Sequence, residues 1–124
     1  GAQLAPDIGI DGALSPEGAT VELIEMLDAA GPFGAGNPRP RFVLPSVATV
    51  NARIVGTDHV SCFLAPPEGG TRLKAIAFRA VGEPIGDALL ARGGGDLHLA
   101  GHLRMNRWQG NENVQLIIED AAKA

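Results

Sequence analysis

The side chains that could do metal or covalent chemistry are few, and their spacing is poor for it. Asp58 and His59 are adjacent in a predicted turn, and no second group of metal-ligating residues lies near them in the sequence. His98 and His102 share one face of a predicted strand. Four residues of strand separate them by about 13 Å, which is too far for one metal ion unless the strand deforms. We therefore expect Asp58 to be a turn aspartate beside a strand histidine.

The single cysteine and the glycine run also fail to indicate catalysis. One cysteine, Cys62, excludes an internal disulfide framework and a cysteine zinc site, and it fits a reducing compartment. Cys62 alternates with Val60 and Leu64, so we expect it in the core. The run Gly93–Asp96 resembles a phosphate loop in composition, but such a loop follows a strand and precedes a helix. Here a predicted helix comes first, so the run is interpreted as a helix end and linker.

Cations and aromatic rings interleave in the second half of the chain, a pattern typical of surfaces that bind single-stranded nucleic acid. The cations hold phosphates, and each stacked base is worth about 1–3 kcal/mol. The candidate binding residues are Arg53, Phe63, Lys74, Arg104, Arg107 and Trp108. The alternative is that the rings pack under the N-terminal helix or against another domain. We expect Phe78 to be a core residue and Trp108 to lie on the surface, and both interpretations stay open for Phe63.

The net charge of −4 is distributed unequally along the chain. Residues 1–38 carry six acids and no base, residues 39–107 carry nine bases and five acids, and residues 108–124 have a net charge of −2. A basic middle region suits nucleic acid, because a binding surface needs local positive charge. Solvated protein surface explains the same charges equally well. With 45% hydrophobic residues the chain can form a packed core, and it has no apolar run long enough to span a membrane.

Hydrophobic periodicity predicts a helix followed by a set of strands. Ser15 and Pro16 are typical of a helix start, and Gly31 of its end. Residues 7–14 form a possible short strand before it. The later pattern predicts a short helix and five strands, at 84–92 and at 42–55, 59–64, 72–79, 96–107 and 114–119. Five strands with a helix between the third and fourth indicate a mainly β protein with the OB-fold, a Greek-key barrel.

A Gly- and Pro-rich segment at 31–40 (GPFGAGNPRP) separates the two patterns. It predicts a linker between residues 1–38 and an OB domain at 39–124. Its glycines permit positive φ and its prolines restrict the exit path, so it could orient the two parts rigidly or bring backbone N–H groups to a phosphate. The orienting role is the preferred interpretation. The linker residues concerned are Pro32, Phe33, Gly34, Gly36, Asn37, Pro38 and Pro40.

The segment Pro32–Phe42 resembles the PFGxGNPxPxF signature of the RecJ family, bacterial exonucleases that degrade single-stranded DNA 5′→3′. Two further segments are similar to motifs of that family and follow in the same order. They are Leu73–Phe78 (LKAIAF) and the hairpin that joins Asn106–Gly110 (NRWQG) to Val114–Leu116 (VQL). The resemblance extends over about residues 7–122.

The resemblance implies an OB domain that serves a catalytic core found elsewhere. RecJ enzymes use two divalent metal ions, Mn²⁺ or Mg²⁺, held by a DHH domain. None of those motifs occurs here, and neither Asp58–His59 nor Gly93–Asp96 stands in for one. The chain begins with Gly1 and shows no signal peptide, so we expect an excised, cytoplasmic segment that includes the end of the preceding DHHA1 domain.

The implied role is to hold single-stranded DNA for the DHH and DHHA1 domains in DNA repair and recombination, with no cofactor or catalysis of its own. The alternative is a structural clamp or protein-interaction module without autonomous DNA binding. That alternative rests on the helix stripe Val21, Ile24 and Leu27, which needs a packing partner.

Overall fold

A computed structural model describes residues 12–29, 40–91 and 96–124. Of the linker signature only Pro40 falls within this part of the chain, and the predicted glycine run at 93–95 lies outside it. In the described residues no helix is long and apolar enough to cross a membrane.

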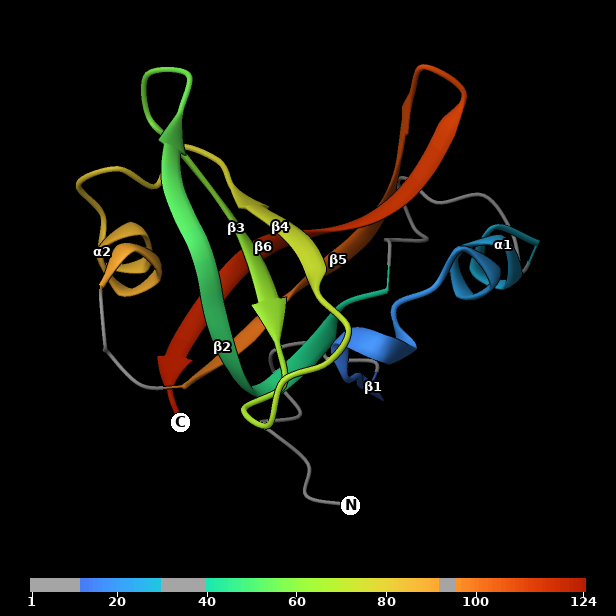
Figure 1. Cartoon of the computed structure of the whole chain (residues 1–124), viewed down its shortest axis with the longest axis horizontal. Helices are drawn as coiled ribbons and strands as arrows, with labels where there is room; N and C mark the ends of the chain where they lie inside the picture. The colour runs from blue at the N-terminus through green and yellow to red at the C-terminus, as the bar shows by residue number, and fades with distance from the viewer. Residues whose placement is uncertain (1–11, 30–39, 92–95) are drawn as a thin grey trace.

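The strands of the described chain close into a barrel (Figure 1). Strand β2 (Phe42–Val55) pairs antiparallel with β3 (His59–Ala65), and β3 pairs antiparallel with β4 (Leu73–Ala77). Strand β4 runs parallel to β6 (Asn111–Lys123), which pairs antiparallel with β5 (Leu97–Trp108). Pairing of β5 with β2 closes the barrel. This order is that of an OB-fold, so the predicted fold class is confirmed.

Most predicted strand and helix bounds agree with the structure to within two residues, but β6 is much longer than predicted. It extends from Asn111 to Lys123, because it pairs with β5 along the whole of that length. Its polar ends lack the apolar alternation that indicates a strand, so the pattern revealed only the middle. The hairpin turn is formed by Gln109 and Gly110, whose φ values of 50° and 82° are both positive, as in a type I′ turn.

The start of the N-terminal helix was predicted wrongly. Pro16–Gly18 form a short 3₁₀ helix, and Ser15 makes no side-chain capping bond to it. The α-helix α1 (Val21–Ala29) begins only after Thr20, whose Oγ1 accepts a hydrogen bond from the Leu23 N–H at 3.1 Å. The non-helical ψ of 84° at Ala19 separates the two helical segments, and the hydrogen bond to Leu23 makes Thr20 the N-cap of α1.

The predicted short strand near the N-terminus is present as β1 (Gly12–Ala13), which pairs parallel with β2. Residues 7–11 of that prediction lie outside the described part of the chain. The helix α2 (Pro84–Leu90) begins at the predicted Pro84 and lies beside β2 and β3. Figure 1 shows α1 on the opposite side of the molecule, near the long β5–β6 hairpin.

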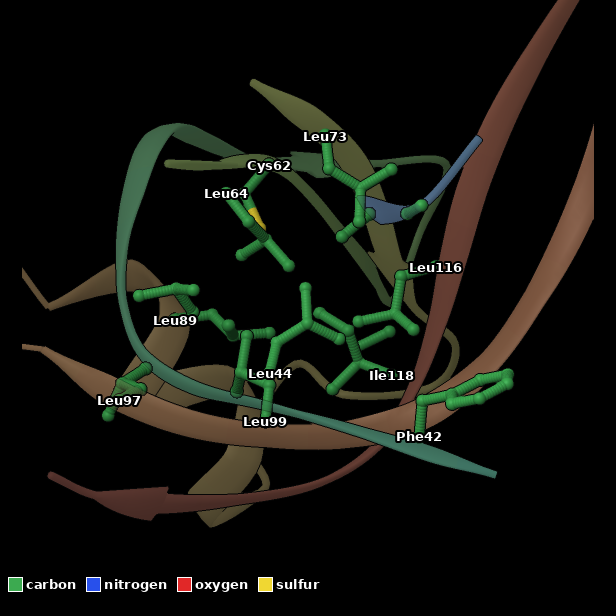
Figure 2. Packing of buried hydrophobic residues seen from close by; sticks show 14 of the residues in the cluster. Phe42, Leu44, Cys62, Leu64, Leu73, Leu89, Leu97, Leu99, Leu116 and Ile118 are labelled. Atoms are coloured by element: carbon green, nitrogen blue, oxygen red, sulfur yellow. The ribbon is translucent and has the colours of Figure 1, made fainter. Parts of the chain in front are cut away.

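Alternate side chains of every barrel strand form one hydrophobic core (Figure 2). Leu44, Leu64, Leu99 and Leu116 are fully buried there, one from each of four strands. Leu89 extends into the same core from α2, and it is fully buried as well. From α1, Ile24 is buried against the barrel, and Leu23 and Leu27 pack beside it. The apolar stripe of α1 therefore has its packing partner within this chain.

Cys62 is a core residue, as predicted, with 1% of its surface exposed. Burial raises the pKa of its thiol from 9.0 to about 12, because the charged thiolate is poorly solvated there. The thiol therefore keeps its proton in the folded state at pH values where the unfolded chain loses it. Its contribution to stability is complete below about pH 9 and is lost as the pH rises towards 12.

We expect the Cys62 thiol to be inert in the native protein, since the thiolate is the reactive species. At pH 8 a disulfide reagent such as Ellman's should leave the folded chain unmodified over minutes. It should react at once, and with one equivalent, after unfolding in guanidinium chloride. Rapid reaction of the folded chain would show that β3 opens far more readily than its burial indicates.

Candidate nucleic-acid interface

The strand register aligns four side chains on the outer surface of the barrel. Phe63 on β3 is opposite Lys74 on β4, Lys74 is beside Gln115 on β6, and Gln115 is opposite Arg104 on β5. Their sequence neighbours, such as Cys62, Ala75 and Leu116, point into the core. Because side chains alternate along a strand, these four must point outward together. We call Phe63, Lys74, Gln115 and Arg104 the cationic row.

Arg53 lies beside this row but not in it. It is opposite Ser61 on the outer surface, and Ser61 belongs to the next row with Ile76, Ile117 and His102. Ser61 and Ile117 are buried although they face outward from the barrel, whereas Arg53 is exposed. Arg53 is therefore placed at the margin of the surface that carries the cationic row.

Arg104 is held by two neighbours. Its Nη2 donates a hydrogen bond to Gln115 Oε1 at 2.9 Å, and Gln115 is itself only 5% exposed. Its Cζ lies 5.8 Å from the centre of the Phe78 ring, within the range of a cation–π contact. The guanidinium group is thus positioned before any ligand arrives. Lys74, in contrast, makes no ion pair with any residue that the structure describes.

The prediction that Phe78 is a core residue is wrong. Its exposure is 45%, among the highest of the described large hydrophobic side chains. Strand β4 ends at Ala77, and Phe78 continues the outward alternation of Lys74 and Ile76. Hydrophobicity had indicated burial, whereas the alternation with the buried Ala75 and Ala77 indicates exposure. Phe63 is half-buried, so it is neither a fully buried core residue nor a fully exposed surface residue.

A groove of about 820 Å³ extends the cationic row towards α1. Phe63 and Lys74 belong to both the row and the groove. The other sides are the 3₁₀ helix and the start of α1, the segment before β4, and the β5–β6 hairpin, which Figure 1 shows projecting beyond the barrel. The other polar lining side chains are two carboxylates, one arginine and four neutral groups: Glu17, Glu112, Arg72, Thr20, Thr71, Asn106 and Asn113.

The structure does not bring Arg107 into the row. Arg107 is three residues from Arg104, so the two side chains leave opposite faces of β5. Its Nε contacts Glu112 Oε2 at 3.0 Å, in a pair whose side chains are 71% and 48% exposed. An ion pair this exposed contributes about 0–1 kcal/mol, so a phosphate could displace Glu112 at small cost. Trp108 ends β5, and its side chain lies outside what the structure describes.

The residues considered for metal chemistry have structural roles. The carbonyl oxygen of Asp58 accepts hydrogen bonds from the N–H groups of Ala80 and Val81, at 2.8 and 3.0 Å. His59 Nδ1 accepts one from the Arg79 N–H at 2.9 Å. Both contacts join the β2–β3 turn to the chain after β4. The turn interpretation is confirmed, and the described residues contain no cluster of three or more histidine, cysteine or acidic side chains that could hold a metal ion.

His98 and His102 are on one face of β5, as predicted, and they serve different partners. His98 Nδ1 accepts a hydrogen bond from the Ser46 N–H at 3.0 Å, where β2 bulges and Ser46 has a φ of 53°. His102 Nδ1 lies 3.5 Å from Glu119 Oε1, and Glu119 also contacts Arg41 at 3.1 Å. His98 therefore stabilises the bulge in β2, whereas His102 belongs to a surface cluster with Glu119 and Arg41.

Sequence reasoning missed Gln115 and Phe78 as members of this surface. Gln115 is a polar residue at an outward position between the apolar Val114 and Leu116, and that alternation was a usable signal. The hydrogen bond between Gln115 and Arg104 could not be predicted from the sequence, because that bond depends on the register between β5 and β6.

Comparison with known proteins gives concordant results. The family model described as the RecJ OB domain matches residues 10–120. The single-stranded-DNA-specific exonuclease RecJ of Escherichia coli K12 is 33% identical over 118 residues, which cover 94% of this chain and 19% of that protein. The chain therefore spans about a fifth of the length of this curated relative.

Solved structures agree with the sequence matches. The crystal structure of Thermus thermophilus RecJ in complex with Mn²⁺ aligns with a TM-score of 0.68 and 26% identity, over 93% of this chain and 16% of that one. The same protein in complex with Mg²⁺ aligns with a TM-score of 0.64 over 90% of this chain and 16% of that one.

Proposed function

The chain belongs to the RecJ OB domain family, and from this premise we propose that it binds single-stranded DNA on behalf of a RecJ-like 5′→3′ exonuclease. The observation that carries the proposal is the cationic row, in which the register places the Phe63 ring next to Lys74 and a second cation, Arg104, on the other side of Gln115. Cations bind the phosphates of a single strand while aromatic rings stack on its bases. The proposed contacts are Arg53, Phe63, Lys74, Arg104, Arg107 and Trp108.

The proposed path of the DNA crosses the barrel strands along the row. Arg104 and Lys74 would each bind a phosphate, and Phe63 would contact a base where the row opens into the groove. Arg107 would contribute from the hairpin after releasing Glu112. Lysine and arginine contacts of this kind release counterions, so binding should weaken as salt is added.

We propose that the rest of the enzyme supplies the chemistry. The E. coli relative is named a single-stranded-DNA-specific exonuclease, and the Thermus structures contain RecJ with Mn²⁺ or Mg²⁺. The described side chains of this chain do not form a donor set for such an ion. In the proposal residues 1–38 end the preceding DHHA1 domain, residues 39–124 form the OB domain, and a cytoplasmic DHH core hydrolyses the DNA during repair and recombination.

The alternative role, a clamp or docking module without DNA binding, has lost the feature that suggested it. Ile24 and Leu27 of that stripe pack on the barrel together with the neighbouring Leu23, and Val21 lines the groove. Met26 is the exposed large apolar side chain that α1 retains, and a single exposed residue is ordinary protein surface.

A fluorescence titration tests the proposal directly. Trp108 is the only tryptophan, so its emission reports on the hairpin without a label. On addition of oligo-dT we expect quenching at low salt that weakens at moderate salt, because phosphate contacts release counterions. Absence of binding at low salt, confirmed by an anisotropy assay on labelled oligo-dT, would reject autonomous DNA binding and favour the clamp.

A further inference from the structure

We propose that Phe78, with Arg104 and His59 beside it, forms a stacking site for one unpaired nucleobase of the bound strand. This inference rests on the proposed function. It adds Phe78, a residue expected from the sequence to lie in the core, to the proposed DNA contacts. The ligand is a planar heteroaromatic ring attached to a phosphate backbone.

The ring of Phe78 is exposed on the same outer surface as the cationic row. It follows Lys74 and Ile76 in outward alternation and has 45% of its surface exposed. A single exposed hydrophobic residue is common and proves nothing by itself. The contacts around Phe78 are more informative, because they fix the ring at the end of β4.

One of these contacts is with His59. The two rings are perpendicular, at 81°, with their centres 5.2 Å apart, so an edge-to-face contact supports Phe78 from the side of β3. His59 is itself anchored, since its Nδ1 accepts the Arg79 N–H at 2.9 Å. The Asp58 carboxylate is also near, with its Oδ1 3.4 Å from His59 Nδ1, so one acidic group borders the site on this side.

The second contact is with Arg104. Its Cζ lies 5.8 Å from the Phe78 ring centre, and Gln115 Oε1 holds its Nη2 at 2.9 Å. The Gln115 side chain that holds Arg104 is almost fully buried, so its own position is restricted by packing. Both neighbours of Phe78 are therefore positioned by hydrogen bonds of their own. A site formed in advance loses less conformational entropy when it binds its ligand.

A nucleobase suits this arrangement better than an isolated apolar group. A phenyl ring stacks on any base, because every base has a π face, and an arginine beside the ring can reach the phosphate next to the stacked base. Lys74, two residues before the outward Ile76, supplies a second cation on the same surface. The site thus adjoins the proposed path at Arg104, beyond the end of β4 that lies away from the groove.

Phe78→Leu tests the inference, with Phe78→Trp as the matched aromatic variant and Met26→Ala as the distant control. The probe is oligo-dT with a single 2-aminopurine, whose fluorescence changes when it stacks, placed at each position in turn. For Phe78→Leu we expect affinity to fall about tenfold, and the 2-aminopurine signal to disappear at one position. The salt dependence should stay as in the original chain, because no charge is lost. Phe78→Trp and Met26→Ala should retain affinity and signal.

The outcomes separate this inference from the proposed function. If Phe78→Leu binds as the original chain does, with the same 2-aminopurine profile, and Lys74→Glu loses affinity, the stacking site is refuted and DNA binding stands. If the original chain binds no DNA, both proposals fail. Thermal unfolding of each variant checks folding, and the half-exposed position of Phe78 predicts that Phe78→Leu folds normally.

Discussion

Replacing Gly101 with alanine is expected to destabilise the barrel by about 3 kcal/mol, the upper part of the usual cost of overpacking. A Cβ at this position would lie 1.9 Å from the carbonyl oxygen of Ile117 and 2.9 Å from its carbonyl carbon. Both are backbone atoms of β6, at the bulge where the register between β5 and β6 shifts. The methyl group can be accommodated only if two paired strands of a closed barrel move apart.

Thermal and urea unfolding followed by circular dichroism would measure this effect. A loss of about 3 kcal/mol should lower Tm by roughly 10 °C in a chain of this size. Gly12→Ala is the matched control, since its Cβ would meet only the Phe42 ring at 3.7 Å, an ordinary contact. Equal Tm values for the Gly101 and Gly12 variants would contradict the close approach of β5 and β6.

The second large effect concerns DNA affinity. We expect Lys74→Glu to weaken binding of oligo-dT about 30-fold, which corresponds to about 2 kcal/mol for one lost charge-assisted phosphate contact. Lys74 stands in the middle of the cationic row, between Phe63 and Gln115, and it also lines the groove. A carboxylate there would repel the phosphate that the lysine is proposed to hold.

The salt dependence gives a second and independent readout of the same variant. Loss of one phosphate contact should reduce the slope of log K against log salt by about 0.7 for single strands. Lys123→Glu carries the same change of net charge at the exposed far end of β6, so it should leave affinity and slope nearly unchanged. If the two variants weaken binding equally, only the overall charge matters and the row is not the binding surface.

The Lys74 and Phe78 variants probe different terms of one interface. The lysine contributes charge, and its loss changes both affinity and salt slope. The phenyl ring contributes stacking, and its loss is expected to change affinity alone. A binding surface made of both terms is what the interleaved cations and rings of the sequence had indicated.

The local sequence pattern was sufficient to predict the fold and part of the core of this protein. Alternation of Val60, Cys62 and Leu64 identified an inner face and placed the cysteine in the core, where the structure has it. Hydrophobic periodicity, with Gly or Pro near the ends, predicted the individual strands and the helix between them. The order of these elements then indicated the OB-fold. The same alternation put Phe63 on the face opposite Cys62, although its burial stayed open.

The errors arose where the deciding interaction lay between elements. Ser15 has the type of a helix cap, but the chain forms a 3₁₀ turn first, and Thr20 caps α1. Phe78 has the type of a core residue, but it continues the outward alternation of Lys74 and Ile76 and is 45% exposed. The ends of β6 have no strand pattern, yet their pairing with β5 makes them a strand.

By itself the sequence determined the fold class, the inner face of the strands at 59–64, 96–107 and 114–119, and the residue types available for binding. Those properties follow from the order of the elements and from the alternation of apolar and polar residues within each strand. Both can be read from residues that are close in the sequence. Only the tertiary structure decided which outward side chains meet. The register across β3, β4, β6 and β5 aligns Lys74 with Gln115 and Gln115 with Arg104. Register depends on how the whole barrel closes, so no single segment encodes it.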